Sequence, residues 1–302
     1  MKAIIDLGTN TFHLLIAEIE HGAIIEHRKI QIPVKIGEGG INEQYIAPAA
    51  YERGMNALKT FREALNEFGI HEITAFGTSA IRDASNGLTF INDAKRLYQI
   101  TIESISGEYE AELIYRGVQH SFDLPDANVL VMDIGGGSVE FIIGRKETIL
   151  WKHSYPLGAA RLIERFHNSD PISDVEVVSL QSYLVHNIKL LRDALLQFPA
   201  EILIGSAGSF ETLVEVLQKD LHKPVLHLGD HAQQISLDDF NEFVELITSR
   251  NATERAALNG MADFRVEMIV VATILMDVVI RRFEITRLIA SQYSLKEGML
   301  FS

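Results

Sequence analysis

Two stretches of the chain share one pattern of apolar and polar positions. Residues 3–16 read AIIDLGTNTFHLLI and residues 130–143 read LVMDIGGGSVEFII, at an offset of 127 positions. In each copy an apolar run leads to an aspartate, a glycine and small polar residues, after which apolar positions resume. Apolar runs on both sides of a short polar turn are typical of two paired strands. The pattern therefore predicts a duplicated strand–turn–strand unit.

Strand-like and helix-like periodicities alternate along the rest of the chain. Further strands are predicted over 12–20, 23–32, 72–76, 100–105, 139–143, 148–154, 201–205 and 285–290. Helices are predicted over 48–68, 87–98, 108–120, 237–250 and 265–282, and others from Ser209 and from Ser173, where Ser173 and Glu176 have capping-box spacing. Residues 220–236 show no clear pattern and are expected to form a loop. The alternation favours α/β layers with mixed sheets flanked by helices.

The duplication also predicts how the chain divides. Each copy of the repeat opens one half of the sequence, so we expect two α/β domains that face each other. The segment HSFDLPDA at 120–127 separates them. This places an N-terminal domain over 1–124 and a C-terminal domain over 125–302, whose last residues are expected to pack back on the first.

Composition and charge narrow the class of function. The 302 residues include no cysteine, which excludes disulfides and thiolate metal sites and fits a reducing compartment. The net charge is −14, and such a field repels nucleic acid and other polyanions. No apolar run is long enough to span a membrane, and no signal peptide is evident. We therefore expect a cytoplasmic protein that binds neither nucleic acid nor membranes.

Three loops have the residue types of a phosphate site. They are DLGTNT at 6–11, DIGGGS at 133–138 and IGSAGSFET at 204–212. Glycine permits a positive φ and lets amides converge on an anion, while short hydroxyls add donors. A carboxylate repels bare phosphate, so Asp6 and Asp133 are expected to hold Mg²⁺ or to orient water. One glycine-rich turn alone is often structural, but its duplication favours phosphate binding.

Two further segments carry candidate side chains. GTSAIRDASN at 77–86 places Arg82 after a strand, where it either grips phosphate or is a solvated helix-start residue. SGEYEAELIYRGV at 106–118 begins a helix with three acids, a pattern that also complements a helix dipole. Glu110 shares a helical face with Ile114 and Gly117 and so points inward. A carboxylate turned into a phosphate cleft can take a proton from water.

Together these motifs resemble the exopolyphosphatase / guanosine pentaphosphate phosphohydrolase family, within the superfamily of actin, sugar kinases and heat-shock chaperones. The resemblance covers nearly the whole chain and includes VKIGEGG, PLGAARL and RVEMIVVATILM in the family's order. It implies two actin-like (ribonuclease H-like) domains with the active site in the cleft between them. It also implies release of terminal phosphate from polyphosphate or guanosine pentaphosphate, with Mg²⁺ or alternatively Mn²⁺.

The resemblance assigns roles to individual positions. The family's catalytic glutamate falls on Glu110 and its metal- and water-handling aspartate on Asp133. Metal-site positions are Asp6, Asp133 and Glu140, and Arg82 is the arginine that holds the phosphate chain. The phosphate loops fall on Gly8, Thr9, Asn10, Thr11, Gly135, Gly136, Gly137, Ser138, Gly208 and Ser209.

The chain departs from the family pattern at a few places. Tyr109 replaces the first of two adjacent glutamates, which leaves one acid fewer near the candidate base. The third loop reads Ala207-Gly208-Ser209 instead of S-G-T, and the L-R-E-G pattern appears as Leu295-Lys296-Glu297-Gly298. The C-terminal helical domain of longer members is absent from these 302 residues. With the net negative charge, this predicts short phosphate contacts and poorly processive hydrolysis.

Several alternatives stay open at this level. The same fold serves small-molecule kinases and non-catalytic actin-like scaffolds or nucleotide sensors, because fold alone does not fix function. The choice between polyphosphate and guanosine pentaphosphate is also open. So is the oligomeric state, for which a homodimer formed through the C-terminal half is one arrangement.

Overall fold

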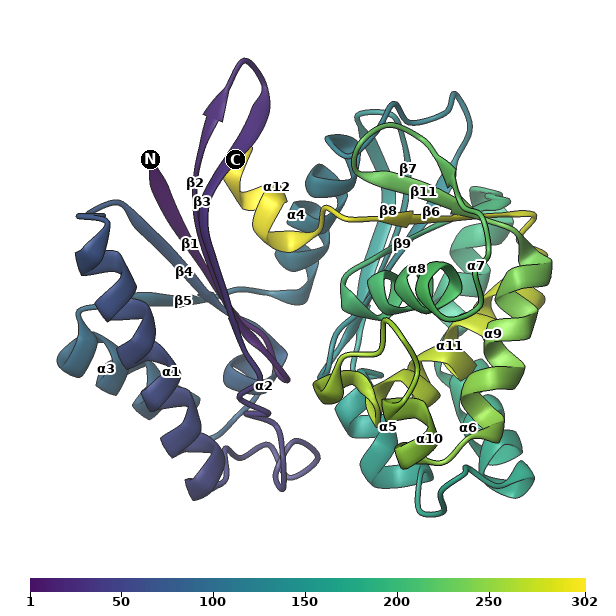
Figure 1. The fold of residues 1–302 in the computed structure, drawn as a ribbon, viewed down its shortest axis with the longest axis horizontal. Coiled ribbons are helices and arrows are strands. Elements are labelled where there is room, and N and C mark those ends of the chain that lie inside the picture. Colours follow the sequence, from purple (N-terminus) through teal and green to yellow (C-terminus); the bar gives the residue numbers. More distant parts are fainter.

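A five-stranded sheet forms the first half of the computed structural model, which describes all 302 residues (Figure 1). Its order is β3-β2-β1-β4-β5, where β1–β3 form an antiparallel meander and β4 and β5 run parallel to β1. Residues of α1 and α3 join those of the sheet in one hydrophobic core. The bounds are β1 Lys2–Leu7, β2 Phe12–Glu20, β3 Ala23–Ile32, α1 Pro48–Glu67, β4 Ile73–Gly77, α2 Ser79–Arg82, α3 Gly87–Tyr98 and β5 Ile102–Ser104.

A seven-stranded sheet organises the second half in the order β10-β11-β12-β9-β6-β7-β8. Its segment β12-β9-β6-β7-β8 repeats the order and the strand directions of β5-β4-β1-β2-β3. The predicted duplication is therefore confirmed at the level of topology, with β10 and β11 as an added edge. The bounds are β6 Val129–Ile134, β7 Val139–Arg145, β8 Thr148–Tyr155, β9 Ile202–Ser206, β10 Leu226–His227, β11 Ala232–Ile235 and β12 Arg287–Ser291.

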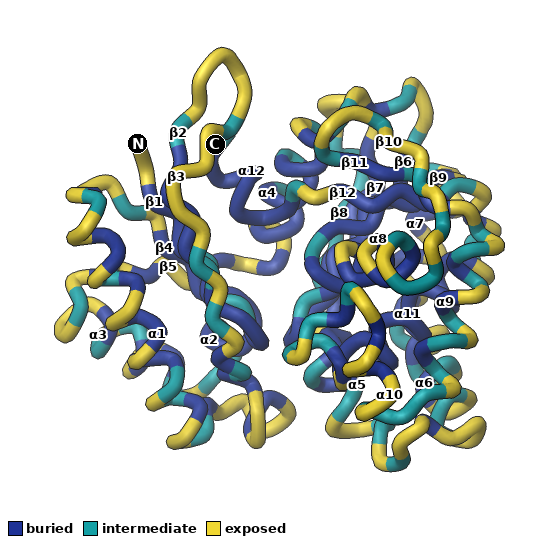
Figure 2. Tube along the Cα trace, in the orientation of Figure 1, coloured by how far each residue is buried: buried dark blue, intermediate teal, exposed yellow.

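Helices surround the second sheet, and the most apolar of them, α11, is enclosed by the others. In α11 every residue from Met268 to Ile280 is buried, so this apolar run lies in the core among the other helices (Figure 2). No helix of the chain has the length and apolarity needed to cross a membrane. The bounds are α5 Ala159–Phe166, α6 Asp174–Asn187, α7 Lys189–Gln197, α8 Gly208–Lys219, α9 Leu237–Ser249, α10 Ala252–Ala256, η1 Asp263–Arg265 and α11 Met268–Arg282.

Two helices lie between the sheets. α4 (Gly107–Gln119) packs against β7 and β8, and α12 (Leu295–Leu300) packs against both α4 and β1 (Figure 1). α12 follows the second sheet in the chain, so the C-terminus returns to the first half. Because α4 also contacts the second sheet, it is shared by both halves. The division at residues 124 and 125 stays a prediction.

The predicted fold class is confirmed, with a few corrections to single elements. The expected loop at 220–236 contains β10 and β11, which are too short to show a sequence period. The long helix expected from Ser173 is two helices that meet at Ile188, although its capping box is present. The helix expected from residue 265 begins at Met268, after a short 3-10 turn. Four short helices, α2, α5, α10 and α12, were not predicted.

Candidate active site

The turn between β1 and β2 holds an unusual number of buried polar atoms without partners. Four of the seven such side-chain atoms in the chain belong to this hairpin: Asp6 Oδ1, Asn10 Nδ2, Thr11 Oγ1 and His13 Nδ1. The backbone amides of residues 9–11 also donate to no group of the chain. Buried polar groups in folded proteins are nearly always paired. Their concentration in one hairpin marks a place where a ligand completes the hydrogen bonds.

The turn between β6 and β7 presents its amides in the same way and is supported from behind. Carbonyls of Gly135 and Gly136 accept hydrogen bonds from Ala159 and Ala160 at the start of α5, over 2.9 and 2.8 Å. With the carbonyls bound on that side, the amides of residues 136–138 donate to no group of the chain. Free amides along a turn form an anion-binding concavity.

The glycines of these turns serve close approach instead of unusual backbone angles. None of Gly8, Gly135, Gly136 and Gly137 has a positive φ, so the conformational reason expected from the sequence is wrong. A Cβ on Gly136 would lie 2.9 Å from Cβ of Thr9, and one on Gly137 would lie 2.5 Å from Oγ of Ser79. The two turns therefore meet across the cleft, and a side chain would hold them apart.

Between the turns lies a small cavity of about 100 Å³, lined by residues of both halves. The lining comprises Asp6, Gly8, Thr9, Asn10, Thr11, His13, Thr78, Glu110, Ile114, Asp133, Ile134, Gly135, Gly136, Gly137, Ser138, Ala207, Arg265, Met268, Ser294 and Leu295. We call this cavity the phosphate pocket, after the ligand that the sequence predicts for its turns.

The third loop supports the pocket from the end of β9. Parallel pairing of β6 and β9 sets Ser206 beside Asp133, and Ser206 Oγ donates to Asp133 Oδ2 over 2.5 Å. Ala207 lines the pocket, whereas Gly208 and Ser209 lie behind it as the first residues of α8. The guanidinium of Arg265 packs directly on Gly208, where any Cβ would collide with it. The missing side chain at Gly208 thus gives Arg265 its place at the pocket.

Glu110 reaches the pocket from the first turn of α4 and is buried, as its helical face predicts. Its Oε2 accepts a hydrogen bond from Arg82 Nη1 over 3.2 Å. Burial raises the pKa of Glu110 well above its usual value, as does the nearby Glu140 carboxylate, while Arg82 opposes the shift. A carboxylate with a raised pKa is a better proton acceptor once it is ionised.

The other buried acids differ in how they are held. Burial raises the pKa of Asp6 to about 7, and Asp6 keeps one oxygen without a partner. Burial and the Asp133 charge raise the pKa of Glu140 to about 7, and Glu140 accepts from Ser154 Oγ over 2.6 Å. Burial also raises the pKa of Asp133, against the Ser206 hydrogen bond. Glu140 and Arg82 do not line the pocket but lie against residues that do.

The residues fit a metal ion that takes few protein ligands. No group of three or more His, Asp or Glu side chains is arranged to hold a metal by itself. Mg²⁺ commonly takes one or two carboxylates, several waters and oxygens of the substrate phosphate. Asp6, with its free oxygen, and Asp133 match that requirement.

The family model of the Ppx/GppA phosphatase family matches residues 15–302. The chain belongs to the Ppx/GppA phosphatase family. The match favours a phosphohydrolase over the kinase and scaffold alternatives that the fold alone leaves open.

Individual members of the family match over nearly the whole chain. A crystal structure of an exopolyphosphatase from Cytophaga hutchinsonii is 39% identical, with a TM-score of 0.94, covering 99% of this chain and 96% of that one. The Aquifex aeolicus Ppx/GppA structure is 26% identical, with a TM-score of 0.79 and coverage of 99% and 95%. A Haemophilus influenzae protein provisionally named an exopolyphosphatase is 29% identical, covering 99% of this chain and 90% of that protein.

Four polar residues of the pocket were missed by the sequence analysis: His13, Thr78, Arg265 and Ser294. A signal existed for His13, because the offset of 127 aligns it with Glu140. In the structure His13 pairs with Asp6 across the strands, as Glu140 pairs with Asp133. For Arg265 the motif at 265–276 was evident, but only the tertiary structure brings it to Gly208. Thr78 follows β4 and had no signal beyond its short hydroxyl.

Proposed function

We propose that the chain is an exopolyphosphatase-type phosphohydrolase that releases terminal phosphate by attack of water in the phosphate pocket. The observation that carries the proposal is the set of unsatisfied hydrogen-bonding groups facing one cavity from both halves. The free amides of residues 9–11 and 136–138, with Asn10 and Thr11 side chains, supply donors. An anion with several acceptor oxygens is the ligand that satisfies them.

Glu110 is the proposed general base. Its carboxylate accepts the proton of the attacking water as the new bond from the water oxygen to the terminal phosphorus forms. The bridging P–O bond then breaks, and the shortened chain leaves with the electron pair. Arg82 holds Glu110 in place through its hydrogen bond. Because Arg82 lies outside the pocket lining, its guanidinium would contact phosphates of the chain beyond the terminal one, whose geometry it fits.

Mg²⁺, with Mn²⁺ as an alternative, is the proposed cofactor. Asp6 and Asp133 would hold it, and Glu140 would act from behind Asp133 through the shared strand pair. When bound, the ion neutralises charge on the phosphate oxygens. With so few protein ligands, its affinity for the substrate-free chain should be weak.

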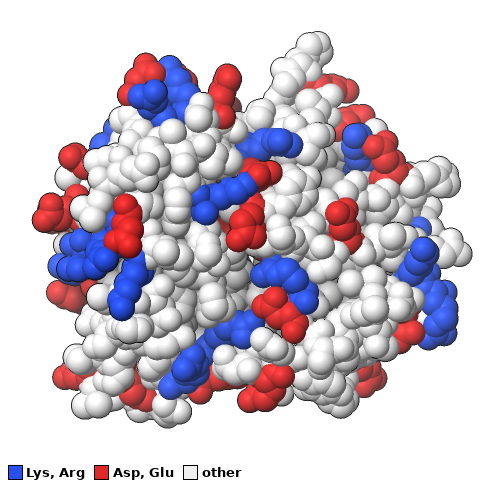
Figure 3. Space-filling view, turned by 180° about the vertical axis from the view of Figure 1, so that it is seen from behind, with Lys and Arg blue, Asp and Glu red and all other residues white.

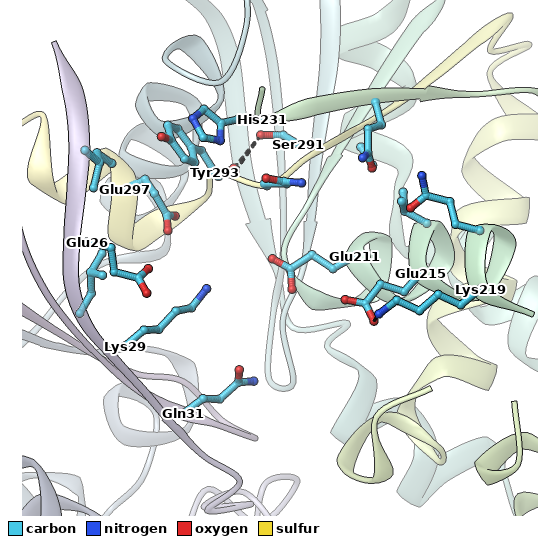
Figure 4. A pocket seen from close by; sticks show the side chains of 17 residues that line it. Glu26, Lys29, Gln31, Glu211, Glu215, Lys219, His231, Ser291, Tyr293 and Glu297 are labelled. Atoms are coloured by element: carbon cyan, nitrogen blue, oxygen red, sulfur yellow. Dashed lines mark hydrogen bonds and ion pairs between the residues drawn. The ribbon is translucent and has the colours of Figure 1, made fainter. Parts of the chain in front are cut away.

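A larger cavity bears on the choice of substrate. It has a volume of about 640 Å³ and lies between β3 and α8, the helix that starts at the phosphate pocket (Figure 4). Four carboxylates line it against two ammonium groups, and the rings of His231 and Tyr293 stack there at 4.2 Å. Its charged residues are Glu26, Glu211, Glu215, Glu297, Lys29 and Lys219.

This lining disfavours a long phosphate chain and favours a nucleoside. Carboxylates repel polyphosphate, but they accept hydrogen bonds from a purine base, which can also stack on aromatic rings. On the face seen in Figure 3, Lys and Arg alternate with Asp and Glu and form no continuous basic surface. We therefore propose that guanosine pentaphosphate and short polyphosphates are hydrolysed at least as well as long chains.

The decisive experiment compares phosphate release from tripolyphosphate, long-chain polyphosphate and guanosine pentaphosphate, with Mg²⁺ and with EDTA. We expect Mg²⁺-dependent release and a ladder of shrinking intermediates on a gel of partly digested long chains. Full-length chains beside free phosphate, with nothing between, would refute the short-substrate proposal. Absence of release from all three would refute the hydrolase. The homodimer and the cytoplasmic location stay predictions, to be checked by light scattering and cell fractionation.

A further inference from the structure

The segment PLGAARL at 156–162 has a structural role that the proposed chemistry does not use. It forms the start of α5, whose first amides bind the carbonyls of the turn at 135–138. Two residues into that helix, Arg161 is only 8% exposed. A buried guanidinium is costly unless its donors are satisfied.

Arg161 satisfies its donors on three separate segments. Nε donates to the carbonyl of Gly137 over 2.8 Å, which is part of the second glycine turn. Nη1 donates to the carbonyl of Ile41 over 2.6 Å, and Nη2 donates to Asp83 Oδ2 over 3.0 Å. Gly137 belongs to the second half of the molecule, while Ile41 and Asp83 belong to the first. One side chain thus joins both halves at the edge of the phosphate pocket.

From Asp83 the contacts continue to the candidate base. The second oxygen of Asp83, Oδ1, accepts from Arg82 Nε over 3.2 Å. Arg82 Nη1 then donates to Glu110 Oε2 over 3.2 Å. An unbroken series of hydrogen bonds therefore runs from the carbonyl of Gly137 through Arg161, Asp83 and Arg82 to Glu110.

We propose that Arg161 is a positioning residue that sets the second glycine turn and the Arg82–Glu110 pair relative to each other. It acts through Asp83 and through the carbonyl of Gly137, and it touches no reacting atom. The planar fork of a guanidinium is what allows bonds to three acceptors, because an ammonium is a single point donor. The predicted effect of Arg161 on catalysis rests on the proposed hydrolase activity.

The first test is Arg161→Lys, which keeps the charge and loses the fork. We expect kcat on tripolyphosphate to fall about 10- to 100-fold, the scale for a misplacement of about 1 Å at a reacting centre, with a smaller change in KM. The matched control is Arg165→Lys, one turn further along α5. Arg165 is exposed and donates to the hydroxyl of Tyr183, away from the pocket. Equal activity of the two variants would overturn the proposal.

The second test is Asp83→Asn, alone and combined with Arg161→Lys. Asn keeps the shape of Asp83 and removes the charge that both arginines share. If Arg161 acts through Asp83, the double variant should lose little more than the worse single variant, because residues in one network are not additive. Losses that multiply would overturn the proposal. If Arg161→Lys does not fold, Asp83→Asn decides, and an unchanged kcat in it contradicts the proposal.

A third readout does not depend on turnover. Amide hydrogen exchange of residues 158–160, whose amides donate to the carbonyls of the turn at 135–138, and of residues 81–83 should be faster in Arg161→Lys than in Arg165→Lys, since the Arg161 bonds to both segments are lost. Unchanged exchange in both segments would overturn the positioning role. If the wild-type chain hydrolyses no phosphate, the proposed function fails, yet this exchange measurement still decides whether Arg161 fixes the two segments.

Discussion

The hairpins β1–β2 and β6–β7 have turns of equal length and carry their aspartates at the same register. The residues that lie beside the two aspartates differ, however. Asp133 lies beside Ser206 of the parallel strand and accepts its hydroxyl hydrogen bond. Asp6, at the equivalent place, lies beside Phe76, which has no donor. Across each hairpin, Asp133 pairs with Glu140, whereas Asp6 pairs with His13.

Asp133 is therefore hydrogen-bonded within the protein, whereas Asp6 has an oxygen that is open to a ligand. In the second hairpin both acids are hydrogen-bonded by serines, so their positions are fixed without a ligand. In the first, an oxygen of Asp6 and a ring nitrogen of His13 remain unpaired. Burial lowers the pKa of His13 well below its usual value, so it is neutral at pH 7. The two hairpins thus have the same backbone arrangement. The residues on the adjoining strands determine whether each aspartate is already hydrogen-bonded or is available to a ligand.

The largest effect on activity is expected at Glu110, the carboxylate that α4 places between the two hairpins. Glu110→Gln removes the proposed base and should lower kcat by about 10²- to 10⁴-fold with little change in thermal stability. Glu108→Gln is the control, because Glu108 lies exposed on the same helix. If Glu110→Gln keeps more than about a tenth of the activity, a hairpin carboxylate such as Asp133 is the base instead.

The two aspartates can be compared directly by their need for metal. Asp6→Asn and Asp133→Asn should each raise the Mg²⁺ concentration for half-maximal activity by at least about 10-fold. Ser206→Ala should produce a smaller shift in the same direction, because it only frees Asp133. A wild-type chain that retains bound metal after purification without substrate would argue against this weak, substrate-assisted site.

An intermediate effect is expected at Arg82, which joins the first hairpin's domain to Glu110. Arg82→Lys should raise KM for tripolyphosphate about 10-fold, since an ammonium cannot match phosphate geometry in the same way. Steady-state kinetics with Arg96→Lys as a control test it, because Arg96 pairs with Asp93 on the surface. An unchanged KM would return Arg82 to a purely structural role.

The buried carboxyl of Asp6 in the β1–β2 hairpin should also affect how the stability of the fold depends on pH. The pKa of Asp6 rises from 3.8 to about 7 in the fold, so the folded chain keeps a proton that the unfolded chain releases. Stability from this group is therefore full below pH 4 and is lost as pH rises to about 7. In EDTA, Tm should fall by at least about 3 °C over this range, and less in Asp6→Asn. A Tm that rises equally in both proteins would contradict the assignment.

The smallest effect is expected at the third loop. Ala207 has φ 66° and ψ 179°, a combination that glycine adopts without strain and alanine does not. Ala207→Gly should therefore stabilise the fold by about 1 kcal/mol, measured by urea unfolding. Ala80→Gly is the control: it sits in a right-handed helix, where glycine should destabilise. Equal losses in both would show that the backbone at residue 207 is not strained.

The sequence by itself determined the repeat, the two-sheet architecture and most of the pocket. Local patterns suffice for these features, because an apolar strand, a small-residue turn and the next strand are contiguous in the chain. The inward position of Glu110 followed from helical periodicity alone. Short elements such as β10, β11 and α5 were missed because two to eight residues contain too few periods to be distinguished from a loop.

Only the tertiary structure decided the features that depend on residues far apart in sequence. The contacts of Ser206 with Asp133, of Arg265 with Gly208, and of Arg161 with Asp83 each join segments more than fifty residues apart. The reason for Gly136 and Gly137 also changed, since the closeness of the two turns, and not the backbone angle, requires glycine there. Packing sets which buried atoms find partners, and the unpaired ones that remain define the site.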